Sequence, residues 1–271
     1  MELAGTDPAL AALLAWYLEA GVDETIGEEP LDRHAPPPPE PVASPGADGE
    51  PKPPPAPAAA PAPSVAHRPP VAAAVAAAAD ASTLQELRAL LAGFEGCALA
   101  KTATNLVFGE GSATARVVLI GEAPGSEEDR RGVPFVGPSG QLLDRMLASI
   151  GLTRADVFIS NTVFWRPPGN RSPSSGEVAV CMPFLERMIE LIDPQVVVAL
   201  GGPAANALLG RGESIGKLRG RWFTYQTPRL PRPVPTTALF HPAYLLRTPG
   251  QKRLAWRDLL ALRHKLDDLG G

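Results

Sequence analysis

Three polar side chains stand where strand-like apolar runs of this sequence end. Glu122 follows "RVVLIG", Asn161 ends "DVFISN" and His241 ends "PTTALFH", while Phe135 lies in the glycine-rich loop after Glu122. The carboxyl ends of parallel strands meet at one edge of a sheet, and ligands bind there. We therefore expect these four residues to share one site.

The four side chain types suit a flat pyrimidine. An asparagine amide offers a donor and an acceptor to the edge of the base, and a phenylalanine ring offers a stacking face. A neutral histidine can donate to a carbonyl oxygen that gains negative charge. Taken alone, an asparagine at a strand end is more typical of a turn or cap, Phe135 of a core and a histidine of a surface or core position, so only their joint placement favours base chemistry.

The glycine-rich loop itself is not typical of a phosphate-binding loop. It has neither the G-K-[ST] ending of a P-loop nor a G-x-G-x-x-G pattern. It also carries acids where a phosphate would need cations, at Glu122, Glu127, Glu128 and Asp129. The loop is therefore expected to hold a ligand other than a phosphate.

Basic residues follow the same strand ends. Residues 81–271 hold 22 basic and 17 acidic side chains, whereas residues 1–80 hold 3 and 12. Cations outside a base pocket can hold a phosphate backbone, as in nucleic-acid binding. The candidates are Arg166, Arg171, Arg247, Lys252 and Arg253.

Alternating strand and helix patterns predict the fold. Continuous Val/Ile/Leu runs alternate with amphipathic segments, which is typical of a parallel sheet covered by helices. We predict an α/β fold with three α/β/α layers and a central, mostly parallel four-stranded sheet. The predicted strands are residues 116–121, 156–161, 195–201 and 235–241, and the helices lie within 82–94, 140–151, 176–192, 203–210 and 251–266.

The chain divides into three predicted regions. Residues 1–26 contain a short amphipathic helix at 8–20, which either docks on its own domain or binds a protein partner. Residues 27–80 are a proline/alanine-rich linker expected to be disordered, since 15 of the 32 prolines fall within 34–70. Residues 81–271 form the main domain.

Composition narrows the class of protein. No apolar run reaches the roughly 18 residues that a membrane span needs, and the start has no basic segment typical of a secretory signal. Two cysteines are too few for a disulfide framework. We expect a monomer in a bacterial-type cytoplasm, associated with the nucleoid and with no membrane association.

Three blocks in order give the sequence a family resemblance. They are "GEAPGSEEDRRGVPFVGPSGQLLD", "SNTVFWRPPGNRSPSSGEVAVC" and "FHPAYLLRTPGQKRLAWRDL". Over about residues 81–265 the chain resembles family 4 (type-4) uracil-DNA glycosylases. The resemblance implies a DNA repair enzyme that flips uracil out of DNA and hydrolyses its N-glycosidic bond, which leaves an abasic site.

The resemblance also implies roles for individual residues. Glu122 would orient the attacking water, and His241 would stabilise the departing uracil at its O2 oxygen. Phe135 would stack on the uracil and Asn161 would read its polar edge. Gly121 and Ala123 complete the implied uracil-binding set, and Leu245 and Leu246 fall where such enzymes push a wedge into the emptied base stack.

The sequence departs from the family at its iron–sulfur positions. Family 4 enzymes carry a [4Fe–4S] cluster on four cysteines, and here those positions are Phe94, Cys97, Trp165 and Cys181. Two thiolates cannot supply the four that such a cluster normally needs. We therefore predict no metal and no cofactor, with apolar side chains in place of the cluster.

Two other functions stay open from the sequence. One is a relative that traps the abasic sugar covalently on a loop nucleophile, although residues 211–223 contain no histidine. The other is a catalytically inactive DNA-binding or damage-sensing relative, although Glu122, Asn161 and His241 are all present.

Overall fold

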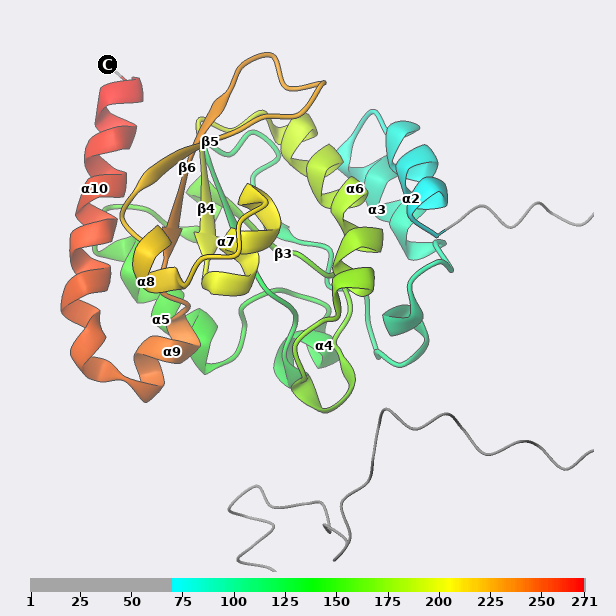
Figure 1. The fold of residues 1–271 in the computed structure, drawn as a ribbon, viewed down its shortest axis with the longest axis horizontal. Helices are drawn as coiled ribbons and strands as arrows, with labels where there is room; N and C mark the ends of the chain where they lie inside the picture. Colours follow the sequence, from blue (N-terminus) through cyan, green and yellow to red (C-terminus); the bar gives the residue numbers. More distant parts are fainter. Residues whose placement is uncertain (1–69, 271) are drawn as a thin grey trace, which may run out of the picture. The chain divides into compact units, whose positions relative to one another are not determined.

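The computed structural model describes residues 70–270, and its centre is a sheet with helices packed around it (Figure 1). The sheet has six strands in the order β1-β3-β2-β4-β6-β5. The four inner strands run parallel and coincide with the four predicted strands. The sequence pattern missed two antiparallel edge strands, which are short or exposed. The strands are β1 (Glu110–Gly111), β2 (Val117–Gly121), β3 (Val157–Asn161), β4 (Val196–Leu200), β5 (Trp222–Tyr225) and β6 (Val234–Leu239).

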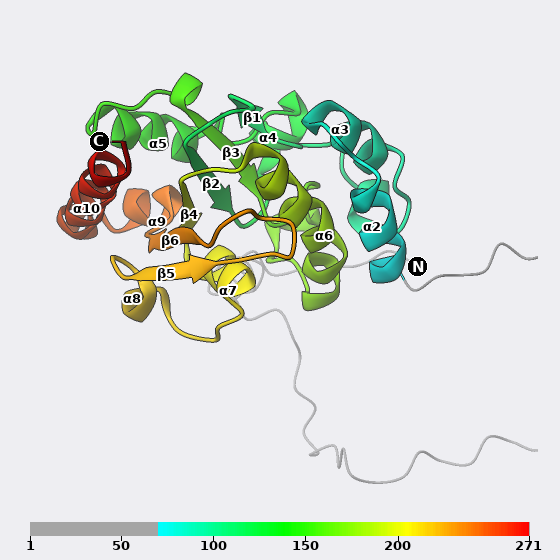
Figure 2. The same ribbon diagram turned by 90° about the horizontal axis from the view of Figure 1, so that it is seen from above.

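Helices cover both faces of the sheet, as predicted, and Figure 2 shows the three layers from above. One face carries α5 (Pro138–Ala148), α9 (Pro242–Arg247) and α10 (Lys252–Gly270). The other carries α2 (Pro70–Ala79), α3 (Leu84–Ala92), α6 (Ser175–Ile192) and α7 (Gly202–Leu209). Two short helices, α4 (Ser126–Arg131) and α8 (Ile215–Leu218), lie in connections.

The alternation of strand side chains explains the two cores. In β2, Val117 and Leu119 pack with α5 and α10, whereas Val118 and Ile120 pack with α3 and α6. Successive side chains of a strand point to opposite faces, so a strand covered on both faces is apolar throughout. This is why the parallel strands could be recognised as continuous apolar runs.

Local capping explains where the helices begin. Thr83 caps α3 by accepting a hydrogen bond from the Glu86 amide, and Ser174 caps α6 in a reciprocal pair with Glu177. The Ser174 pair is a capping box, and at Thr83 the Glu86 carboxylate accepts from the Ser82 amide instead; in both, a side chain satisfies a free backbone amide of the first turn. Helix α3 lies within its predicted range of 82–94, and α6 begins one residue before the predicted range of 176–192.

The predicted linker is corrected at its end. Residues 27–80 were expected to be disordered, but Pro70–Ala79 form α2, which buries Ala74 and Ala78 against α6 and α3. The alanine-rich stretch has few large side chains, so it gave little amphipathic signal, yet its small faces permit close helix packing. The rest of the linker and the helix predicted at 8–20 lie outside the described residues.

Within residues 70–270, no helix combines the length and the apolar character that crossing a bilayer requires.

Candidate active site

The ends of β2 and β3 bring the first two predicted residues together. Gly121 and Asn161 are direct partners in the parallel pairing of these strands, and the Thr162 amide donates to the Gly121 carbonyl at 2.9 Å. A β-carbon on Gly121 would overlap the Asn161 amide oxygen and lie 2.7 Å from the Phe135 ring. The sequence therefore predicted the meeting of these three residues correctly.

Asn161 has an unusual environment. Its side chain is only 1% exposed, and neither of its amide atoms has a hydrogen-bond partner among the described residues. A buried amide without a partner costs free energy that a ligand can recover by supplying the missing donor and acceptor. The edge of a planar base is such a ligand.

His241 lies next to Phe135, with its ring centroid 5.6 Å from the phenyl centroid. The residue comes two positions after β6 and caps α9, because the Ala243 amide donates to its Nδ1 atom at 3.1 Å. Nδ1 is thus an acceptor, so the proton of the neutral ring is on Nε2. Burial, followed by the charge of Arg247, lowers the pKa of His241 to about 4. The ring is therefore a neutral donor at ordinary pH.

A cavity of about 460 Å³ opens at this edge of the sheet. Glu122 and Ala123 line one side, and His241 lines the other, together with the start of α7. Gly201 at the end of β4 has a φ of 97°, and a β-carbon there would lie 3.2 Å from that of His241. This close approach brings the start of α7 beside the histidine. Phe135 and Asn161 are buried and are not part of the cavity wall.

The predicted cations divide into two groups. Arg171 and Arg247 line the cavity, whereas Arg166, Lys252 and Arg253 do not. Arg171 is also held by Glu177 through bonds of 2.7 and 2.9 Å, and this pairing lowers the pKa of Glu177 to about 2.

The two leucines proposed for the wedge differ in exposure. Leu246 is 40% exposed, but Leu245 is 1% exposed and packs in the core beneath α9. Successive residues of a helix point about 100° apart, so one of two neighbours can face the core while the other faces solvent. We therefore correct the prediction for Leu245, which is a core residue.

The family's cluster positions meet in one apolar core. Cys97, Trp165 and Cys181 are buried in it, and Phe94 packs against it with its ring edge-on to Phe184 at 5.1 Å. Among residues 70–270, no group of three or more His, Cys, Asp or Glu side chains could hold a metal ion. These residues do not fit a [4Fe–4S] cluster, since two of the four positions have no donor atom.

The two cysteines are free thiols that form a hydrogen bond with each other. The Sγ atoms of Cys97 and Cys181 are 4.0 Å apart. This contact, together with burial, raises the pKa of Cys181, whereas the same contact lowers the pKa of Cys97 to about 7. Cys181 is therefore the partner that keeps its proton.

Several cavity residues were not predicted from the sequence. Ile215, Phe240 and Tyr244 add apolar surface, while Asn170 and Ser172 add polar groups from the loop after β3. Tyr244 and Asn170 stand near predicted residues in the sequence, but Ile215 belongs to a four-residue helix with no readable pattern.

A family model and several curated relatives point to one superfamily. The family model for the uracil DNA glycosylase superfamily matches residues 108–260. The chain is 40% identical over 180 residues to a type-4 uracil-DNA glycosylase of Pyrobaculum aerophilum, which covers 65% of this chain and 91% of that protein. It is 45% identical over 166 residues to the enzyme of the same name from Thermotoga maritima, covering 60% and 84%. A third, from Archaeoglobus fulgidus, is 44% identical over 157 residues, covering 56% and 78%.

Proposed function

Because the chain belongs to the uracil-DNA glycosylase superfamily, we propose that it is a DNA repair hydrolase that releases uracil from DNA. The reaction flips the uridine nucleotide out of the duplex, hydrolyses the N-glycosidic bond and leaves an abasic site. The type-4 relatives support the choice of uracil, since they carry that activity in their names.

The observation that carries this proposal is the Asn161 amide. It is buried, lacks partners in the described part of the chain and lies beside the Phe135 ring at Gly121. A uracil edge offers one N–H and one carbonyl oxygen to such an amide, and the ring gives the base a stacking surface.

The proposed chemistry is dissociative. As the glycosidic bond lengthens, charge grows on the uracil O2 oxygen, where the Nε2–H group of His241 donates. A donor that is fixed in advance stabilises such charge without reorganisation. The Ala243 amide holds the imidazole in the required tautomer. Glu122 lines the cavity and is proposed to orient the water that captures the sugar.

Proposed contacts to DNA surround the cavity. Arg171 and Arg247 line it, and exposed Leu246 of α9 is proposed to fill the space that the base leaves. Arg166, Lys252 and Arg253 do not line the cavity and are assigned to the phosphate backbone. The protein is expected to act as a monomer at the nucleoid, and a protein partner for the helix predicted at 8–20 stays a proposal.

A gel assay tests the function directly. The purified chain is incubated with duplex DNA that holds one uracil, and the strand is then cleaved with alkali at any abasic site. The expected result is cleavage only of the uracil strand, with no added metal. Binding without cleavage would favour an inactive damage sensor, and a heat-stable protein–DNA adduct would favour covalent capture of the sugar.

We also propose that this enzyme works without an iron–sulfur cluster. The donor set supports this, because Phe94 and Trp165 replace two of the four thiolates. The test is anaerobic purification followed by an iron assay and a visible spectrum. Iron at the level of about four atoms per chain, as a cubane cluster requires, would contradict the proposal whatever the activity.

A further inference from the structure

We propose that Arg154 and Glu128 are positioning residues that hold the Phe135 loop, residues 134–137, from two sides and so fix the stacking ring. The inference rests on the proposed function in one respect, since it takes Phe135 to be the residue that stacks on uracil. The two charged side chains themselves are assigned from contacts within the protein.

The Phe135 loop needs such support because its backbone is strained. Phe135 has a φ of 53°, in the left-handed region that residues with a side chain rarely adopt. The ring is 5% exposed and lies between Gly121 and His241. A strained conformation persists only where the surroundings over-determine it.

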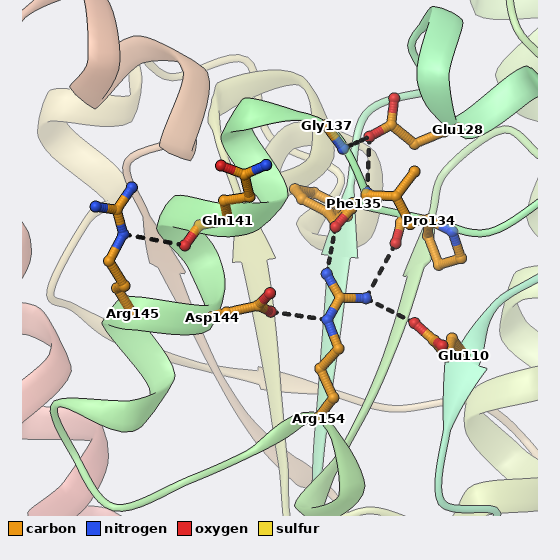
Figure 3. Close-up of polar contacts among 10 residues, drawn as sticks. Glu110, Glu128, Pro134, Phe135, Gly137, Gln141, Asp144, Arg145 and Arg154 are labelled. Atoms are coloured by element: carbon orange, nitrogen blue, oxygen red, sulfur yellow. Dashed lines mark hydrogen bonds and ion pairs between the residues drawn. The ribbon is translucent and has the colours of Figure 1, made fainter. Parts of the chain in front are cut away.

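Arg154 holds the carbonyl side of the loop. It lies in the short 3-10 helix before β3, and its guanidinium donates to the carbonyls of Phe135 and Pro134, the latter at 3.2 Å (Figure 3). Asp144 of α5 and Glu110 of β1 orient the guanidinium through bonds of 2.7 and 2.6 Å. A planar fork fixed by two carboxylates has little freedom to release the loop.

Glu128 holds the amide side. One oxygen of its carboxylate accepts from both the Val136 and the Gly137 amides at 2.9 Å. The side chain extends from α4 and is 8% exposed. Hydrogen bonds to a charged acceptor are stronger than neutral ones. Four consecutive residues of the loop, 134–137, thus each give one backbone group to one of two charged side chains.

Helix α5 closes the third side of the loop. A β-carbon on Gly140 would overlap the Phe135 carbonyl group, which is backbone and cannot turn away. Close packing of α5 at Gly140 therefore restricts movement of the loop toward this helix. A shift of the loop would change the distance between the Phe135 ring and His241, and displacements of about 1 Å at a reacting site can cost roughly 100-fold in rate.

The test replaces each holding group separately. Arg154→Met keeps the length of the side chain and removes the donors, and Glu128→Ala removes the acceptor. We expect single-turnover uracil release to slow by roughly 10-fold to 100-fold in each. Inhibition by free uracil should weaken in parallel, because the ring no longer stacks, whereas binding to undamaged duplex DNA should stay unchanged.

Conservative variants separate positioning from stability. Glu128→Gln keeps a carbonyl oxygen where both amides donate, so it should restore most of the rate lost in Glu128→Ala. Arg154→Lys keeps one donor group and should fall between wild type and Arg154→Met. If Glu128→Gln and Arg154→Lys release uracil no faster than Glu128→Ala and Arg154→Met, the hydrogen bonds to the loop do not set the rate and the proposal is wrong.

Arg187→Met is the matched control. Arg187 also holds a backbone carbonyl, that of Ala81, and pairs with Glu190 at 3.0 Å, but it does so at the junction of α2 and α3. The Arg187→Met variant should lower the stability of the protein about as much as Arg154→Met does, and it should leave uracil release and inhibition by uracil unchanged. An equal loss of activity in this control would overturn the proposal.

Hydrogen exchange tests the inference apart from the activity. In the wild-type protein the Val136 and Gly137 amides should exchange slowly, and Arg154→Met and Glu128→Ala should each speed both. If the wild type shows no uracil release but these amides respond, only the proposed function fails. If the amides do not respond and the release rates stay at the wild-type level, the positioning role fails.

Discussion

At the ends of β2 and β3, Asn161 has a buried side-chain amide with no hydrogen-bond partner among the described residues. At the family's four cluster positions, Phe94 and Trp165 are apolar and the thiols of Cys97 and Cys181 are hydrogen-bonded to each other. Both regions lie in the same domain and both are enclosed. An unsatisfied buried amide is costly, and a ligand can offset that cost by supplying the missing donor and acceptor, while a packed apolar core needs no ligand. The difference separates the region proposed to bind uracil from a region that its own side chains fill.

Alanine substitutions at the strand ends should give the largest effects. His241→Ala and Asn161→Ala are each expected to slow uracil release by roughly 10²-fold or more, as for the loss of a preorganised donor. Asn206→Ala is a matched control, because its amide oxygen also lacks a partner but lies in α7. His264→Ala, on the exposed side of α10, is the control for histidine. If both His241→Ala and Asn161→Ala release uracil at the wild-type rate, these two residues do not belong to the active site.

The pH profile should show that His241 acts as a neutral donor. Its pKa of about 4 means that release should not depend on this group near neutral pH and should fall as the pH drops through about 4. Unfolded histidine titrates near 6.5. Between these values the unfolded chain binds a proton that the folded one does not, so this group lowers stability as the pH falls from about 6.5 to about 4. An acid limb near 6.5 in single-turnover rates would contradict the assignment.

Substitutions of Leu246 and Leu245 should have different effects, because Leu246 is proposed to contact DNA and Leu245 packs in the core. Leu246→Ala is expected to slow release from duplex DNA about tenfold, an effect of the size seen when an apolar contact of 1–3 kcal/mol is lost. Release from single strands should change less, because no stack needs filling. Leu245→Ala should instead lower stability by about 2–5 kcal/mol, as for other buried leucines. Equal effects on duplex cleavage in both variants would contradict the division.

Removing α2 should affect stability but not chemistry. A chain that begins at residue 68 keeps α2, whereas one that begins at Ala81 loses the helix that packs on α6 and α3. The longer form should match the full chain in melting temperature and activity. The shorter form should melt lower, by about 2–4 °C for each kcal/mol lost, and should retain release below its melting temperature.

Changes to the thiol pair should have the smallest effect. Cys97→Ser and Cys181→Ser should lower stability modestly and leave the rate near that of wild type, since a free buried cysteine behaves as a small apolar residue. Thermal unfolding and single-turnover release measure the two quantities. A large loss of activity in either variant would mean that the cysteine region contributes to the site after all.

The sequence by itself determined the elements that carry strong periodic or chemical signals. Continuous apolar runs gave the four parallel strands, because a strand covered on both faces must be apolar throughout. Their polar ends gave Glu122, Asn161 and His241, because parallel topology brings strand ends to one edge. The absence of thiolates at Phe94 and Trp165 could also be inferred from the sequence, because neither side chain type ligates iron.

Only the tertiary structure decided the features that depend on packing. Alanine-rich α2 gains its stability from contact with α6 rather than from its own pattern. Burial distinguished Leu245 from Leu246, and the Ala243 amide fixed the tautomer of His241. Arg154 reaches the Phe135 loop from the start of another strand, and sequence spacing carries no sign of that contact, because it is set by the order of strands in the sheet.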